Sequence, residues 1–215
     1  MTTGRFIALE GGEGAGKSTQ ARLLAEALRT RGIDVVVTRE PGGTPGAEAI
    51  RKLILEGVPG DDGPGWNSRA EALLFAAARS DHVEQLIRPA LARGAWVVCD
   101  RFLDSSRAYQ GGGGGLSDVD ILTLHAIGSM GFLPDLTLLI EVAPGEAAKR
   151  LALRDTDGTD RIGGRGAAYH TRVAEAFAAF AGSEPQRFAR IDGNGTPAET
   201  HSGVLAALAP LLTTP

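Results

Sequence analysis

Cysteine, lysine and long apolar runs are scarce in this sequence, and each scarcity excludes a class of protein. The single cysteine, Cys99, allows no disulfide within the chain, so a reducing cytoplasm is the expected location. No apolar run approaches the roughly 20 residues of a membrane-spanning helix. The only apolar run near the start, Phe6–Leu9, is too short for a signal peptide. We therefore expect a cytoplasmic protein with no membrane partner.

Basic residues are not in excess either. The chain has 22 Lys and Arg against 26 Asp and Glu, a formal net charge of −4. A protein that binds a nucleic-acid groove needs a strongly basic surface, so no nucleic-acid partner is expected. The four histidines show no metal-ligand spacing, and we expect them at surface or capping positions. A length of 215 residues suits a single domain, residues 1–215.

Short apolar runs alternate with segments of helical periodicity along the chain. The expected strands are Arg5–Glu10, Asp34–Thr38, Ala95–Asp100, Leu136–Val142 and Arg187–Asp192. The expected helices are Lys17–Arg31, Ser68–Arg93, Ser117–Met130, Gly145–Arg154, Ala167–Ala181 and Pro197–Leu212. This alternation predicts an α/β fold, a five-stranded parallel sheet flanked by helices. Asp155–Gly166 is too polar to join the core, so we predict a mobile lid at about residues 150–166.

A glycine-rich segment between the first strand and the first helix matches the phosphate-loop pattern G-x-x-x-x-G-K-[ST] at every position. Its glycines let backbone N–H groups turn toward phosphate oxygens, and the helix N-terminus adds positive charge. Lys17 is expected to reach the β- and γ-phosphates, and the Ser18 hydroxyl to ligate Mg²⁺. The predicted ATP-binding residues are Gly11, Gly12, Glu13, Gly14, Ala15, Gly16, Lys17, Ser18 and Thr19.

Charged side chains follow the expected strands, where α/β proteins bind ligands. Asp100 ends the third strand and could help hold Mg²⁺, directly or through water. Arg101 could clamp a phosphate with its planar fork, and Arg39 and Arg51 supply further cations. The alternative for any one arginine is an ordinary surface salt bridge.

Phe75 and Arg79 lie four residues apart and so share one helix face. A flat aromatic ring beside a guanidinium suits a nucleobase, since one stacks and the other donates hydrogen bonds. The alternative for Phe75 is core packing.

Four further segments resemble thymidylate kinases. These segments read TREPGGT at 38–44 with GAEAIR at 46–51, EALLFAAAR at 71–79, DRF at 100–102 with SSRAYQG at 105–111, and the arginines at 150, 154 and 161. They follow in family order and span about residues 5–192. The resemblance implies a P-loop nucleoside-monophosphate-kinase fold and transfer of phosphate from ATP to dTMP, giving dTDP for dTTP synthesis. It also implies a homodimer, of the bacterial type with an acidic phosphate-loop residue and an arginine-bearing lid.

The resemblance also implies roles for individual residues. Thymine would stack on Phe75, and Tyr109 would lie against the deoxyribose. Glu13 would lie near the sugar 3′-hydroxyl, although a solvent-facing position is the alternative. The acceptor-binding set becomes Glu13, Arg39, Arg51, Phe75, Arg79, Arg101, Ser106, Tyr109 and Gln110. The predicted catalytic set is Lys17, Arg101, Arg154, Arg161 and Glu13, with Arg161 nearest the transition state.

One stretch departs from the family pattern. The family usually reads YQG-x-GRGL, whereas this chain has five consecutive glycines at 111–115, so Gly114 replaces an expected arginine. We expect a floppy loop there, because glycine loses the most entropy on ordering. Two other functions stay open at this point: a kinase of the same fold that acts on another nucleotide, and a nucleotide-dependent switch with no small-molecule acceptor.

Overall fold

The computed structural model describes residues 4–57, 65–154 and 161–213, apart from the side chains of Arg154 and Thr213. Five parallel strands form one sheet in the order β2-β3-β1-β4-β5. The strands are β1 (Phe6–Glu10), β2 (Val35–Arg39), β3 (Trp96–Asp100), β4 (Leu136–Glu141) and β5 (Phe188–Asp192). The predicted five-stranded parallel sheet is confirmed, and each strand lies within two residues of its expected bounds.

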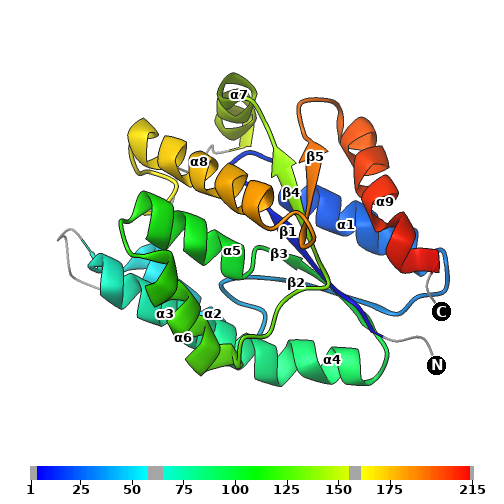
Figure 1. Ribbon diagram of the computed structural model, residues 1–215, viewed down its shortest axis with the longest axis horizontal. Coiled ribbons are helices and arrows are strands. Elements are labelled where there is room, and N and C mark those ends of the chain that lie inside the picture. The colour runs from blue at the N-terminus through cyan, green and yellow to red at the C-terminus, as the bar shows by residue number, and fades with distance from the viewer. Residues whose placement is uncertain (1–3, 58–64, 155–160, 214–215) are drawn as a thin grey trace.

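Helices cover both faces of the sheet (Figure 1). They are α1 (Lys17–Arg29), α2 (Pro45–Glu56), α3 (Ser68–His82), α4 (Arg88–Ala92), α5 (Leu103–Ser106), α6 (Asp118–Ser129), α7 (Pro144–Arg154), α8 (Ala167–Ser183) and α9 (Pro197–Thr213), with π-helical stretches η1 (Val83–Ile87) and η2 (Arg107–Gly113). No helix in the described ranges is long and apolar enough to cross a membrane.

The core forms on the two sides of the sheet. On one side, α1 and α9 pack on it, and Leu24 and Leu208 are fully buried there. On the other side, α3, α6 and α8 cover it, with Phe6 and Phe102 edge to face at 4.8 Å. Because both faces are covered, the inner strands β1 and β3 are almost fully buried and read as apolar runs rather than alternating ones. The edge strands β2 and β5 also carry exposed side chains.

Strand register brings the polar ends of three strands together. Leu9 in β1 pairs with Asp100 in β3, and Asp100 pairs with Arg39 in β2. The carboxyl ends of these strands therefore meet at one edge of the sheet, beside the loop that leads from β1 into α1. Ligands of α/β proteins bind at this edge.

A loop was expected over the glycine run at 111–115, but its first three residues are π-helical, and only Gly114 and Gly115 lie outside the helix. Gly111, Gly112 and Gly113 belong to η2, which packs against α8. A Cβ atom on Gly112 would lie 2.6 Å from Ala176 Cβ, and one on Gly113 would lie 2.5 Å from the Tyr169 ring. The glycines permit close packing of two helices, and the packing orders them.

Two other expectations need correction. The predicted helix at 68–93 is divided into α3, η1 and α4, and helix α2 was not foreseen. The signal for α2 is Thr44, whose hydroxyl caps Ala47 N at 3.2 Å, followed by a proline at the first helical position. His82 and His125 are buried, at 0% and 3% exposure, rather than at the surface.

Candidate active site

The phosphate loop needs glycine at specific points. Gly11 has φ 138°, and a Cβ atom there would lie 2.4 Å from Ile140 O. Gly14 has φ 72°, and its Cβ would lie 2.7 Å from Ala147 O in α7. The loop is thus held between β4 and α7, which leaves no room for side chains at either position.

Lys17 opens helix α1 and turns back over the loop. Its Nζ donates hydrogen bonds to Gly11 O at 3.0 Å and Gly12 O at 2.7 Å. Burial, and next the charge of Arg101, lower the pKa of Lys17 to about 8. An incoming phosphate would add negative charge beside this amine and so favour its charged form.

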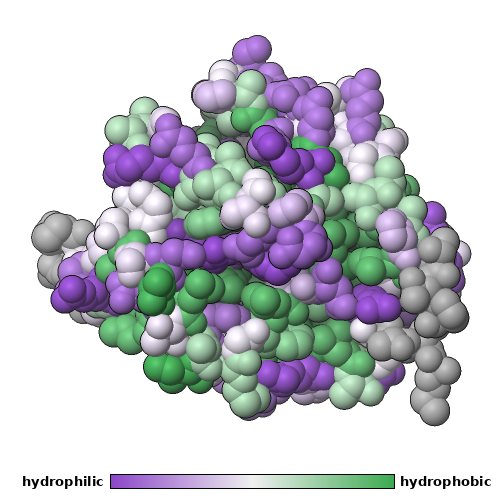
Figure 2. Space-filling view, viewed as in Figure 1, coloured by the Kyte–Doolittle hydropathy of each residue, from purple (hydrophilic) through white to green (hydrophobic). Residues whose placement is uncertain are grey.

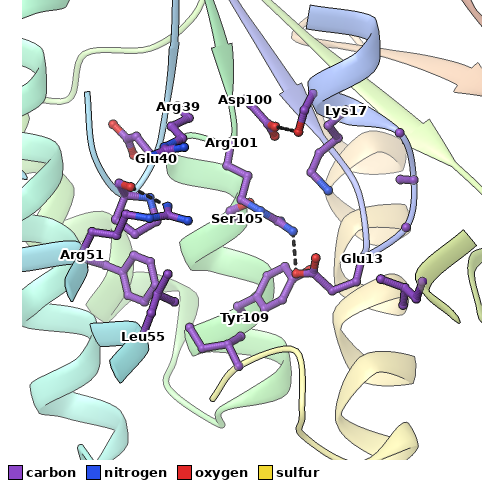
Figure 3. Close-up of a pocket in the computed structure, with 18 of the residues that line it drawn as sticks. Glu13, Lys17, Arg39, Glu40, Arg51, Leu55, Asp100, Arg101, Ser105 and Tyr109 are labelled. Carbon is purple, nitrogen blue, oxygen red and sulfur yellow. Dashed lines mark hydrogen bonds and ion pairs between the residues drawn. The ribbon is translucent and has the colours of Figure 1, made fainter. Parts of the chain in front are cut away.

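A cleft of about 580 Å³ runs from this loop to helices α2 and α3 (Figure 3). Fourteen predicted site residues line it: Glu13, Gly14, Ala15, Gly16, Lys17, Ser18, Thr19, Arg39, Arg51, Phe75, Asp100, Arg101, Tyr109 and Gln110. Further lining residues that the sequence did not single out are Glu40, Pro41, Leu55, Ser105, Leu151 and Ile162. Such a volume lies within the range of small-molecule sites.

Arg101 lies in the middle of the cleft (Figure 3). Its Nη2 donates to Glu13 Oε1 at 2.6 Å, and its Nη1 donates to Ser105 Oγ at 3.1 Å. The guanidinium lies over the Tyr109 ring, 4.9 Å from its centroid. Tyr109 OH also donates to Glu13 Oε1 at 3.1 Å. Arg101, Glu13 and Tyr109 thus form one connected group between the phosphate loop and the far end of the cleft.

Arg79 and Ser106 lie behind the cleft wall, because neither lines it and each is 3% exposed. Arg79 Nη2 donates to Ser106 Oγ at 2.7 Å, and its Nε donates to Glu40 Oε2 at 2.8 Å. His82 Nδ1 lies 3.0 Å from Glu40 Oε1, and its Nε2 lies 2.8 Å from Thr38 Oγ1. Of the predicted base-recognition pair, Phe75 therefore lines the cleft and Arg79 does not.

Ser18 and Asp100 form the predicted metal-ligand pair. Ser18 Oγ donates to Asp100 Oδ2 at 2.5 Å. Asp100 Oδ1 is buried and has no hydrogen-bond partner among the residues that the structure describes. An unpaired buried carboxylate oxygen beside a hydroxyl fits the oxygen ligands that Mg²⁺ prefers, so the residues present suit this ion.

The predicted lid arginines lie in different places. Arg150 in α7 lines the cleft, and its Nη2 donates to Gly195 O at 3.1 Å. Arg161 lies instead against Gly57 and Gly65, where added Cβ atoms would come within 1.9 and 2.2 Å of its guanidinium. The Arg154 side chain and residues 155–160 of the lid lie outside the described residues.

The sequence and the structure of this chain are similar to those of known proteins. A family model described as thymidylate kinase matches residues 9–204. A thymidylate kinase of Rhizorhabdus wittichii is 59% identical over 209 residues, which cover 97% of this chain and 99% of the relative. One of Chromohalobacter salexigens is 50% identical over 208 residues, covering 97% and 96%. The crystal structure of thymidylate kinase from Ehrlichia chaffeensis matches with a TM-score of 0.75 at 32% identity, covering 95% of this chain and 98% of that one.

Proposed function

The chain belongs to the thymidylate kinase family, and from that membership we propose how its cleft holds two nucleotides. The enzyme transfers the γ-phosphoryl group of ATP to dTMP, giving dTDP for dTTP synthesis. One observation carries the division of the cleft: Arg101 lies between Lys17 beside the phosphate loop and Arg51 of α2 (Figure 3). ATP occupies the loop side, and dTMP occupies the side of Phe75 and Tyr109.

The acceptor end is built for a pyrimidine deoxynucleotide. Phe75 lines the cleft and is proposed to stack on the base, and Arg79, buried outside the cleft lining, donates to Ser106. Tyr109 is 4% exposed and hydrogen-bonded to Glu13, so its ring is fixed beside the expected sugar position. Arg39 and Arg51 line the same cleft as further cations for the acceptor phosphate. These contacts support the proposed acceptor site.

The phosphoryl step requires charge to be neutralised from several sides. Lys17 approaches from the loop, Arg101 from the end of β3, and Arg150 from α7. Ser18 and Asp100 would hold Mg²⁺, which when bound offsets negative charge on the ATP phosphates. The acceptor oxygen is already anionic, so these residues orient and stabilise charge rather than remove a proton. Arg161 and Arg154 are proposed to join them from the lid.

We also propose that the protein is a homodimer of single-domain subunits, residues 1–215. Apolar side chains stand exposed on α3 and α6 and just beyond them, and Figure 2 shows hydrophobic atoms over this part of the surface. Leu73 is 56% exposed, Val119 71%, Ile127 77% and Met130 72%. Exposed apolar patches of this kind mark protein contacts. Light scattering at micromolar concentration should report twice the mass of one 22.3 kDa chain. The lone, buried Cys99 supports a cytoplasmic location.

The acceptor preference tests the proposed function. ADP release should be measured in a coupled assay with dTMP, dUMP, dCMP, GMP and AMP under the same conditions. We expect ADP formation to depend strictly on a monophosphate and to be fastest with dTMP. A preference for AMP or GMP, or ADP release without any acceptor, would contradict the proposed acceptor site.

ATP binding should take up a proton near pH 8. Because burial lowers the pKa of Lys17 to about 8 before binding, part of the molecules carry a neutral amine at that pH. The bound phosphates raise this pKa, so affinity falls as the pH rises through 8 and above. Calorimetry at pH 8 in two buffers of different ionisation enthalpy should show net proton uptake when ATP binds. Lys17→Met is the control and should abolish the uptake. An equal heat in both buffers with the wild-type protein would refute the expectation.

A further inference from the structure

Glu10 is a buried carboxylate that no predicted role uses. It ends β1 immediately before the phosphate loop and is 0% exposed. Its Oε1 accepts hydrogen bonds from Phe102 N at 2.8 Å and Ser105 N at 3.0 Å. Its Oε2 accepts from Ser105 Oγ at 2.6 Å. All three donors belong to the segment that follows β3, the segment that carries Arg101.

Ser105 connects this carboxylate to Arg101. The Ser105 hydroxyl gives its hydrogen to Glu10, so its lone pairs face Arg101 Nη1, which donates to Ser105 Oγ at 3.1 Å. Arg101 itself has φ 70°, a backbone conformation that residues other than glycine rarely adopt. Such a conformation persists only where neighbouring contacts fix it. The hydrogen bonds that Phe102 and Ser105 donate to Glu10 hold the residues after Arg101, and Arg101 N itself donates to Leu9 O at 2.9 Å.

We propose that Glu10 is a positioning residue that directs the Arg101 guanidinium through Ser105 and the backbone of the β3–α5 turn. This inference rests on the proposed contact of Arg101 with the reacting phosphates. Glu10 touches neither nucleotide and acts only by holding Arg101. Groups that support a functional residue in this way commonly change activity by about 10- to 100-fold when altered.

The charges around Glu10 make its effect depend on pH. Burial, and next the carboxylate of Asp104, raise the pKa of Glu10 to about 7, while Arg101 lowers it. Glu10 also interacts electrostatically with Lys17 on α1 and with the Cys99 thiol on β3. Only the ionised carboxylate accepts from all three donors without offering a proton of its own. The directing effect should therefore strengthen as the pH rises through 7.

Glu10→Gln is a selective test, because glutamine keeps the side-chain size and one oxygen. The oxygen can still accept from Phe102 N and Ser105 N. The amide in place of Oε2 can only donate to Ser105, so the bond that directs the hydroxyl is reversed. The matched control is Asp135→Asn at the other end of β1, where Asp135 Oδ2 accepts from Phe6 N at 2.7 Å. Thermal melting should show both variants folded.

We expect E10Q to lower kcat/KM for dTMP by about 10- to 100-fold and D135N to leave it unchanged. In an Arg101→Ala background, adding E10Q should change the rate by less than about threefold, because coupled residues are not additive. The ratio of wild-type to E10Q activity should grow between pH 6 and pH 8. The phosphate of dTMP titrates in both proteins and so cancels from this ratio.

Three results separate the inference from the proposed function. An undiminished effect of E10Q in the Arg101→Ala background would overturn the link through Arg101. A ratio of activities that stays flat from pH 6 to pH 8 would overturn the role of the ionised carboxylate. Wild-type kcat/KM in Arg101→Ala alone would instead overturn the proposed role of Arg101, which is a failure of the functional assignment.

Discussion

Replacing Arg161 with alanine is expected to lower kcat for dTDP formation by about 10³-fold or more, the usual loss when a transition-state arginine is removed. In the structure its guanidinium lies against Gly57 and Gly65 rather than along the cleft. Contact with the transferring phosphoryl group therefore requires this side chain to leave that position. Because the arginine would act only in the transition state, we expect kcat and kcat/KM to fall together, with the ATP dissociation constant nearly unchanged.

Steady-state kinetics with varied dTMP measure kcat and kcat/KM. Titration with ATP in the absence of dTMP measures the ATP dissociation constant. Arg161→Lys keeps the charge but not the planar fork, so its activity should lie between those of wild type and alanine. Arg190→Ala is a control, since Arg190 pairs with Glu141 on the surface at 2.7 Å, away from the cleft. Unchanged turnover in Arg161→Ala would assign the transition-state role to another cation.

Replacing Arg107 with alanine is expected to destabilise the fold by about 3–5 kcal/mol, the typical cost of breaking a buried charge network. Arg107 is 5% exposed and donates to Asp104 at 2.9 Å, to Asp118 at 2.8 Å and to Glu184 at 2.8 Å. Its guanidinium also lies 4.0 Å from the Phe180 ring centroid. Asp104 is 1% exposed and pairs with both Arg107 and Arg187, so the substitution leaves it with Arg187 alone.

Denaturant unfolding measures the loss of stability, and Arg190→Ala again serves as the comparison. Arg190 also makes two hydrogen bonds to one carboxylate, but its side chain is 58% exposed, so little change is expected there. Glu184 and Asp118 lie near the chain's surface and can regain water, whereas Asp104 cannot. Equal stability of the two variants would show that burial does not decide the value of these ion pairs.

Much of the fold is encoded locally and was therefore predictable. The inner strands are mostly apolar runs such as Phe6–Leu9, because both sheet faces are covered. The phosphate loop is a contiguous motif, and most residues expected beside it line one cleft. Helix α2 escaped prediction because glycines and prolines around Thr44 resemble a loop, although Thr44 and Pro45 are a helix start.

The supporting contacts were not predictable in the same way. Glu40 forms a buried network with Arg79 and His82, which lie 39 and 42 positions after it in the sequence. Glu10 meets Ser105 across 95 positions. No spacing rule connects such pairs, since strand order and helix placement bring them together. The same holds for the glycines of η2, whose order depends on how closely α8 approaches.

The sequence by itself determined the layered α/β architecture, the phosphate loop and the identity of most cleft-lining side chains, because periodicity and contiguous motifs act over a few residues. Only the tertiary structure decided which carboxylates hold the cationic side chains: Glu13 and, through Ser105, Glu10 for Arg101, and Glu40 for Arg79. The physical reason is that a buried charge requires a partner, and the partner comes from whichever segment the packing of the sheet and helices brings within hydrogen-bonding distance.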